Sequence, residues 1–252
     1  MAIIIPPEIK NFHKVFEPLC YMHDAADVFD TFLEWLIAGW NADDTLKWES
    51  GKRYKEKERR QFYTLFEELV KVLNVKIRKD GQWYDLFGTY YESFVAGKSR
   101  RDSRGQFFTP SHICDFKAKI VGAEDKETGL RVSDPCSGSG RLLLAFHAHA
   151  PGNFLYASDI DRTCCMMTVC NFLMHGGVGE VVWHNSLLPN SWNYGWRVNA
   201  NLNNPFHKYY GIPHVETLQQ ENSLVFKHWQ QKIAEAEIEK PKLPTQLTLF
   251  EI

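Results

Sequence analysis

A short glycine-rich loop carries the clearest chemistry in the sequence. Residues 134–140 read Asp-Pro-Cys-Ser-Gly-Ser-Gly; the stretch before them predicts a short strand, and the stretch after them predicts a helix. A strand that ends in an acid and a glycine turn, then opens a helix, is how a doubly wound α/β fold holds a nucleoside-like cofactor. We expect Gly138 and Gly140 to let the backbone approach this ligand, and Asp134 to anchor one of its polar groups.

A second acid follows at the end of the next predicted strand. Residues 154–159 form that strand, and Asp159 is its last residue. One carboxylate can accept hydrogen bonds from both hydroxyls of a ribose, so we predict that Asp159 is a ribose ligand. The alternative is that Asp159 caps the following helix, a role for which Asp161 is better placed.

The predicted elements divide the chain into three parts. Residues 1–104 are mostly helical, with apolar residues on one face at 24–40 and 54–73 and with Asp24 as an N-cap residue. Residues 105–210 form an α/β core with four parallel strands in the order 3-2-1-4. Residues 211–252 contain one helix and an extended tail. The expected fold is therefore a partial parallel sheet preceded by a helical domain.

Composition and charge exclude several classes of protein. The chain has 252 residues with 44% hydrophobic residues and a net charge of −2, so contact with nucleic acid must come from local basic patches. Six cysteines occur without a Cys-x-x-Cys pair, which favours reduced, buried thiols and predicts no metal site. No signal peptide and no apolar run of about 20 residues is evident, so we expect a cytoplasmic protein.

One basic segment precedes the core. Lys98, Arg100, Arg101 and Arg104 stand in a short polar stretch that suits a linker between domains. Four cations in seven residues can also bind the phosphate backbone of DNA. One segment can serve both purposes, and the sequence leaves the two open.

Three ordered motifs resemble one enzyme family. They are Asp-Leu-Phe-Gly-Thr-Tyr-Tyr-Glu at 85–92, Gly-Gln-Phe-Phe-Thr-Pro at 105–110 and the loop at 134–140. Their order and approximate spacing resemble the modification subunits of type I restriction systems and related N6-adenine DNA methyltransferases. The resemblance covers roughly residues 85–206. It implies a Rossmann-like methyltransferase fold, S-adenosylmethionine as cofactor, DNA as substrate and a separate subunit for target recognition.

The same resemblance assigns cofactor contacts. Phe108, Thr109 and Pro110 would lie against the methionine end of the cofactor, and Asp134 would orient its amino group. The remaining implied contacts are Pro135 in the glycine loop, Ile160 after the ribose-binding acid, and Asn185 near the adenine of the cofactor, where the family usually has an acid.

The resemblance also implies a catalytic motif, Asn-Pro-Pro-aromatic, which here reads Asn203-Asn204-Pro205-Phe206. An adenine amino group is a poor nucleophile, because its lone pair is delocalised into the ring. Two acceptors on its hydrogens, the amide oxygen of Asn203 and the carbonyl of Asn204, would aim that lone pair at the methyl group. Phe206 would stack on the base after it leaves the duplex. Methyl transfer would then be direct, without a covalent enzyme intermediate.

Two departures from the family pattern keep alternatives open. Asn204 replaces the first proline and loosens the backbone, and 46 residues follow Phe206, where the family completes its sheet and adds a recognition region. We therefore expect a core truncated after the catalytic motif. The alternatives are an asparagine-rich turn in a degenerate protein that binds DNA or a sliding clamp without catalysis, and the same chemistry on RNA or on a protein glutamine.

The tail carries a further motif. Gln246, Leu247, Leu249 and Phe250 belong to a sequence similar to the peptides by which bacterial replication proteins dock on the sliding clamp. Such peptides place a leucine and a phenylalanine in a preformed apolar groove. The alternative is that these apolar residues pack against the body of the chain itself.

Overall fold

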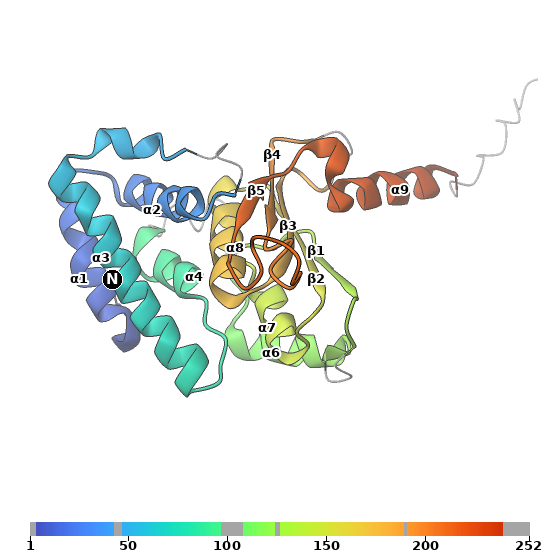
Figure 1. Cartoon of the computed structure of the whole chain (residues 1–252), viewed down its shortest axis with the longest axis horizontal. Coiled ribbons are helices and arrows are strands. Elements are labelled where there is room, and N and C mark those ends of the chain that lie inside the picture. Colours follow the sequence, from blue (N-terminus) through green and yellow to red (C-terminus); the bar gives the residue numbers. More distant parts are fainter. Residues whose placement is uncertain (1–3, 43–46, 97–107, 124–126, 189–190, 239–252) are drawn as a thin grey trace, which may run out of the picture.

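The computed structural model describes residues 4–42, 47–96, 108–123, 127–188 and 191–238. The N-terminal helices gather on one side of the molecule and a β-sheet lies on the other (Figure 1). Helix α8, Arg162–His175, lies between them, because it contacts both α2 and the central strands. None of the described helices combines the length and the apolar character needed to span a membrane.

The helical part is built around aromatic side chains. Its main helices are α1 (Lys10–Phe16), α2 (Ala25–Gly39), α3 (Glu56–Leu73) and α4 (Leu86–Tyr90). Asp24 caps α2 as predicted, since its carboxylate accepts a hydrogen bond of 2.9 Å from the amide of Ala26. The fully buried ring of Phe12 packs against the fully buried rings of Phe32 and Tyr90, with a tilted and an edge-on contact.

Five strands form one mixed sheet. They are β1 (Arg131–Asp134), β2 (Phe154–Asp159), β3 (Val178–Trp183), β4 (Tyr194–Val198) and β5 (Val215–Thr217), in the spatial order β1-β2-β3-β4-β5. Strands β1 to β3 are parallel, whereas β4 and β5 run antiparallel to their neighbours. The other helices are α6 (Ser111–Ile120), α7 (Arg141–His149) and α9 (Leu224–Ile238).

The predicted strand order 3-2-1-4 is wrong. Strand β4 pairs with β3 and runs against it, with Tyr194 opposite Trp183 and Val198 opposite Gly179. The connection between the two strands, residues 184–193, has ten residues. A crossover to a parallel position needs about a dozen residues or more, usually with a helix, so this short connection returns as an antiparallel strand. In the described chain, no strand pairs with the outer edge of β1.

The sheet also continues beyond residue 210, because β5 adds a strand where the sequence predicted none. A single cluster of buried apolar residues extends from the helical part into the sheet; it includes Phe32 of α2, Met166 of α8 and Val181 of β3. The described helices and the sheet therefore share a continuous core, which fixes the helical part against the strands that carry the site.

Candidate functional site

One cavity in the α/β part opens beyond the carboxyl ends of β1, β2 and β3 and has a volume of about 810 Å³. Six of the residues predicted to bind a cofactor line it together: Phe108, Pro135, Gly138, Asp159, Ile160 and Asn185. A smaller space beside it is lined by Phe108, Gly138, Thr109 and Asp134. This is the edge of an open α/β sheet at which ligands bind.

The glycine loop has the backbone that the sequence predicted. Gly138 and Gly140 have φ values of +56° and +85°, in the left-handed region that favours glycine. A Cβ atom on Gly138 would lie 3.0 Å from the ring of Phe108, and one on Gly140 would lie 3.0 Å from Thr168. The loop therefore packs closely against Phe108 and Thr168, and a side chain at either glycine would displace the loop or its neighbour.

Asp159 lines the cavity at the carboxyl end of β2. Its Oδ2 atom accepts a hydrogen bond of 2.9 Å from the amide of Gly138, and its Oδ1 atom accepts one of 2.9 Å from the amide of Asp161. A carboxylate has about four acceptor positions, so acceptor capacity remains on Asp159 for neighbouring hydroxyl groups. Burial raises the pKa of Asp159, although the backbone amides oppose that rise. Asp161, and not Asp159, caps α8, through a bond of 2.8 Å from the amide of Thr163.

Asp134 has an unused acceptor. Its Oδ1 atom accepts a hydrogen bond of 3.1 Å from the amide of Cys136, while Oδ2 is buried without a partner among the described residues. The hydroxyl of Ser137, in the same loop, is also buried and unpaired there. Burial raises the pKa of Asp134. Because a buried acceptor without a donor is costly, this geometry fits a ligand that brings an amino group to the loop.

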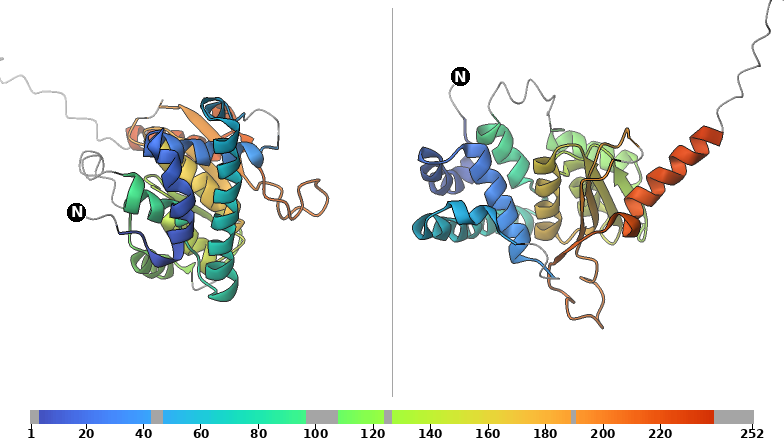
Figure 2. Two further views of the ribbon diagram at one scale, coloured as in Figure 1. Left: turned by 90° about the vertical axis from the view of Figure 1, so that its left-hand side faces the viewer. Right: turned by 90° about the horizontal axis from the view of Figure 1, so that it is seen from above.

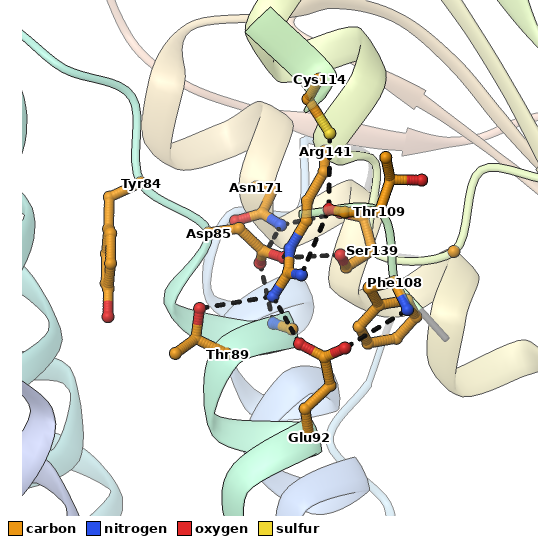
Figure 3. Close-up of polar contacts among 12 residues, drawn as sticks. Tyr84, Asp85, Thr89, Glu92, Phe108, Thr109, Cys114, Ser139, Arg141 and Asn171 are labelled. Carbon is orange, nitrogen blue, oxygen red and sulfur yellow. Dashed lines mark hydrogen bonds and ion pairs between the residues drawn. The ribbon is translucent and has the colours of Figure 1, made fainter. Parts of the chain in front are cut away.

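A polar network that the sequence did not predict lies beneath the glycine loop (Figure 3). Its centre is Asp85, which is 2% exposed and accepts hydrogen bonds from the amide of Gly88 at 2.8 Å, from Ser139 Oγ at 2.6 Å and from Asn171 Nδ2 at 2.8 Å. Arg141 Nε lies 2.7 Å from Asp85 Oδ2. The network ties the start of α4 to the glycine loop and to α8.

Arg141 extends the network to the segment that precedes α6. Its Nη2 atom lies 2.9 Å from Glu92 Oε2, and its Nη1 atom donates to the carbonyl of Thr109 at 3.5 Å. The guanidinium lies over the ring of Phe108, with 5.3 Å between its central carbon and the ring centroid. Glu92 Oε1 also accepts a bond of 3.3 Å from the amide of Phe108. The helical part therefore positions Phe108 and Thr109 against the cavity.

Two acids in the motif at 85–92 indicated part of this network. Asp85 and Glu92 stand roughly two helical turns apart and so share one side of the helix. Their partner Arg141 is 56 residues from Asp85 in the chain, too far for local patterns to reveal the pair. Pro110 is the N-cap residue of α6 and lines a neighbouring cavity of about 780 Å³, together with Asp85, Glu92 and Arg141.

The structure does not bring Asn203, Asn204, Pro205 and Phe206 to the cavity. Because β4 runs antiparallel, it ends beside the amino-terminal end of β3. The glycine loop lies at the opposite end of the sheet, where the parallel strands have their carboxyl ends. The six residues of β3 alone span roughly 16 Å along the strand, from one end of the sheet to the other. The expectation that this motif follows a strand next to β1 is therefore wrong, and the reversal of β4 is the cause.

Asn199 fixes the start of the loop that carries this motif. This residue has a φ of 56°, and its side chain donates to the carbonyls of Phe172 at 3.1 Å and Gly177 at 2.9 Å. Further along, Asn204 Oδ1 accepts a bond of 3.1 Å from the amide of Phe206. The Phe206 side chain points into solvent and is 97% exposed.

Two predicted segments lie outside the described residues. They are the basic segment with Lys98, Arg100, Arg101 and Arg104, and the tail motif with Gln246, Leu247, Leu249 and Phe250.

Comparison with known families adds to this geometry. Residues 82–238 match the family model described as N-6 DNA Methylase, which is more than half of the chain. The chain belongs to this family. The match begins just before Asp85, so the helix that holds the polar network lies within it. Neither curated proteins nor solved structures give a match.

Proposed function

We propose that this N-6 DNA methylase binds S-adenosylmethionine and methylates the N6 atom of adenine in DNA. The observation that carries the proposal is the cavity at the carboxyl edge of the sheet, where Asp159 and the unpaired Oδ2 of Asp134 face the glycine loop. A nucleoside with a neighbouring amino group matches these acceptors. The cofactor, when bound, supplies a methyl group activated by its positive sulfur.

The residues of the cavity have separate parts in this proposal. Asp159 accepts hydrogen bonds from the two ribose hydroxyls, because its carboxylate keeps acceptor capacity beyond its bonds to backbone amides. Asp134 accepts from the amino group of the cofactor, and Asn185 and Ile160 contact its adenine. Phe108 and Thr109, held by Glu92 and Arg141, close the methionine end.

The acceptor base needs groups that this cavity does not itself contain. In the proposal, the amide oxygen of Asn203 and the carbonyl of Asn204 accept the two amino hydrogens of the target adenine, and Phe206 stacks on its ring. The nitrogen lone pair would then attack the methyl carbon directly while the bond from that carbon to sulfur breaks, so that S-adenosylhomocysteine leaves and the amino group loses a proton to solvent. These residues must reach a cavity at the other edge of the sheet.

Methyl incorporation tests the proposal. Purified protein is incubated with S-adenosylmethionine labelled in its methyl group and with duplex DNA, RNA or protein, and the DNA is digested to nucleosides. The expected product is N6-methyladenine in DNA. Asn203→Ala should abolish incorporation while cofactor binding survives, whereas Asn193→Ala, at another exposed asparagine, is the control and should keep its activity. Label in RNA or in protein glutamine alone would contradict the DNA assignment.

A second function is favoured by the place of the asparagine motif. Because residues 203–206 lie away from the cavity, the chain can also act as an accessory protein that binds cofactor and DNA without transferring methyl groups. Cofactor binding without incorporation into DNA, RNA or protein, even with a target-recognition subunit present, would support this second function and exclude the first.

Partners complete the proposal. DNA contact by Lys98, Arg100, Arg101 and Arg104 predicts that replacing them with alanine weakens DNA binding and flattens its dependence on salt. A specificity subunit would supply recognition of the target sequence.

Docking on a sliding clamp through Gln246, Leu247, Leu249 and Phe250 is a separate proposal. A peptide of residues 241–252 should bind purified clamp, and the variant with Leu249→Ala and Phe250→Ala should not. Equal affinity of the two peptides would exclude this docking mode.

A further inference from the structure

The loop between β4 and β5 projects from the body of the molecule, as the brown segment shows in both views of Figure 2. It carries the asparagine motif and exposes three apolar side chains: Phe206 is 97% exposed, Tyr210 58% and Ile212 49%. Exposed apolar side chains grouped on one projecting loop indicate a surface that is covered by a partner.

The projecting loop is held in shape by its own contacts. The amide of Gly211 donates to the carbonyl of Leu202 at 2.8 Å, and the hydroxyl of Tyr209 donates to the carbonyl of Ala42 at 2.9 Å. The ring of Tyr209 stacks on His214, with 4.7 Å between centroids. The loop therefore presents its tip in a defined conformation, which reduces the entropy lost on binding.

The cavity has a surface that complements this tip. Its lining exposes two apolar side chains, Ile160 at 66% and Leu187 at 88%, and the next residue, Leu188, is 56% exposed. Among the described residues of the lining, Asp159 and Asp161 are acidic, and Arg162 is paired with Glu34 at 2.9 Å. The loop tip instead carries Lys208. The two surfaces therefore match in apolar character and are opposite in charge.

We propose that the loop of a second copy of this chain enters the cofactor cavity, so that the methyl-acceptor site is completed between two copies. The inference rests on the proposed function. Within one copy the motif and the cavity lie at opposite edges of the sheet, roughly 16 Å apart, whereas methyl transfer requires reacting atoms about 3 Å apart. A twofold axis between two copies would make the two contacts equivalent, with each loop at the cavity of the other copy.

Strand β1 leaves room for this approach. Its last residue, Asp134, lines the smaller space beside the cavity, and no described strand pairs with the outer edge of β1. In the assembled site, Asn203 and Asn204 of one copy would hold the amino group of the target adenine above the cofactor bound by Asp159 of the other. Phe206 would cover the base, which removes an exposed ring from water.

A disulfide trap tests the contact without relying on activity. Cys136 is an exposed thiol on the wall of the cavity; the other cysteines are half-buried or buried. In cofactor-free protein treated with a mild oxidant, Phe206→Cys should form a disulfide with Cys136 of a second copy, giving a covalent dimer on a non-reducing gel. Phe206→Cys with Cys136→Ser should give none. Absence of the dimer, or its persistence in the double variant, would overturn the inference.

A mixing experiment tests the consequence for catalysis. Cys136→Trp, which fills the cavity, and Asn203→Ala, which removes the acceptor, should each be inactive. Their equimolar mixture should recover about a quarter of wild-type activity, because half of randomly formed dimers are mixed and one of their two sites is intact. Asp159→Ala replaces Cys136→Trp if the latter is unfolded by circular dichroism.

The outcomes separate the inference from the function on which it rests. An active wild type whose inactive variants do not complement would show that the loop acts within its own copy, which overturns the inference. A wild type that transfers no methyl group would refute the proposed function, while the disulfide trap would still decide whether the loop and the cavity meet. Loss of DNA affinity on Phe206→Ala, with no trapped dimer, would assign the loop to DNA instead.

Discussion

Removing Asp85 should destabilise the protein strongly, although this residue lies below the cavity. Its carboxylate is 1% exposed and holds the guanidinium of Arg141, which is 11% exposed. Asp85→Ala leaves that cation buried with Glu92 as its remaining carboxylate, and it takes the acceptor from Ser139 and Asn171. Breaking a buried pair in this way costs about 3–5 kcal/mol.

This prediction is tested by measuring the thermal and chemical unfolding of Asp85→Ala and of a control variant in which an exposed ion pair is broken. For a chain of this size, a loss of this magnitude lowers the melting temperature by roughly 10 °C. Arg60→Gln breaks an equally direct ion pair with Glu56, but both side chains are largely exposed, so that the expected cost is about 0.5 kcal/mol. Cofactor affinity should also fall in Asp85→Ala, because Phe108 and Thr109 depend on Arg141.

A double-mutant cycle would refute the reasoning most clearly. Arg141→Met should cost at least about 2 kcal/mol less in the Asp85→Ala background than in the wild type, because the buried cation is then already unpaired. If the two substitutions are additive, or if Asp85→Ala costs no more than Arg60→Gln, the network does not hold the helical part to the glycine loop.

Three further predictions concern single residues. Burial raises the pKa of Asp30 from 3.8 to about 6. The protonated carboxyl is therefore favoured in the folded protein, and the stability that it contributes is present below pH 3.8 and is lost as the pH rises through 6. In urea unfolding, Asp30→Asn should be more stable than the wild type by roughly 2–3 kcal/mol at pH 7.5 and equally stable at pH 3.5. Gly138→Ala should cost about 1–2 kcal/mol and weaken cofactor binding, because its Cβ meets Phe108 at positive φ, whereas Gly39→Ala has open space and should be neutral or stabilising in the same melts. S-adenosylmethionine should slow the reaction of Cys136 with a thiol reagent, since this thiol lines the cavity, and an unchanged rate would place the cofactor elsewhere.

Local patterns in the sequence predicted the features that depend on neighbouring residues. The glycine loop, the acid at the end of β2 and the capping roles of Asp24 and Asp161 all follow from residue types within a few positions of one another. These features are set by backbone conformation and by short-range hydrogen bonds. Such patterns were therefore enough to predict that Asp159 and Gly138 share one cavity.

The direction of β4 could not be predicted from such patterns. A parallel and an antiparallel β4 read alike in the sequence, and the family resemblance favoured the parallel one. The length of the connection indicates the direction of β4, because the ten residues between Trp183 and Tyr194 are too few for the usual crossover to a parallel strand. The network of Asp85 and Arg141 could not be predicted for another reason: it joins residues that are 56 positions apart in the chain.

Calorimetric titration with S-adenosylmethionine tests the central claim most directly. The wild type should bind one cofactor per chain, and Asp159→Ala should lose at least tenfold in affinity, about 1.4 kcal/mol, because two ribose hydroxyls lose their acceptor. Asp80→Ala, an exposed acid away from the cavity, is the control and should bind as the wild type does. Failure of the folded wild type to bind, or equal affinity of wild type and Asp159→Ala, would contradict the assignment of this cavity to the cofactor.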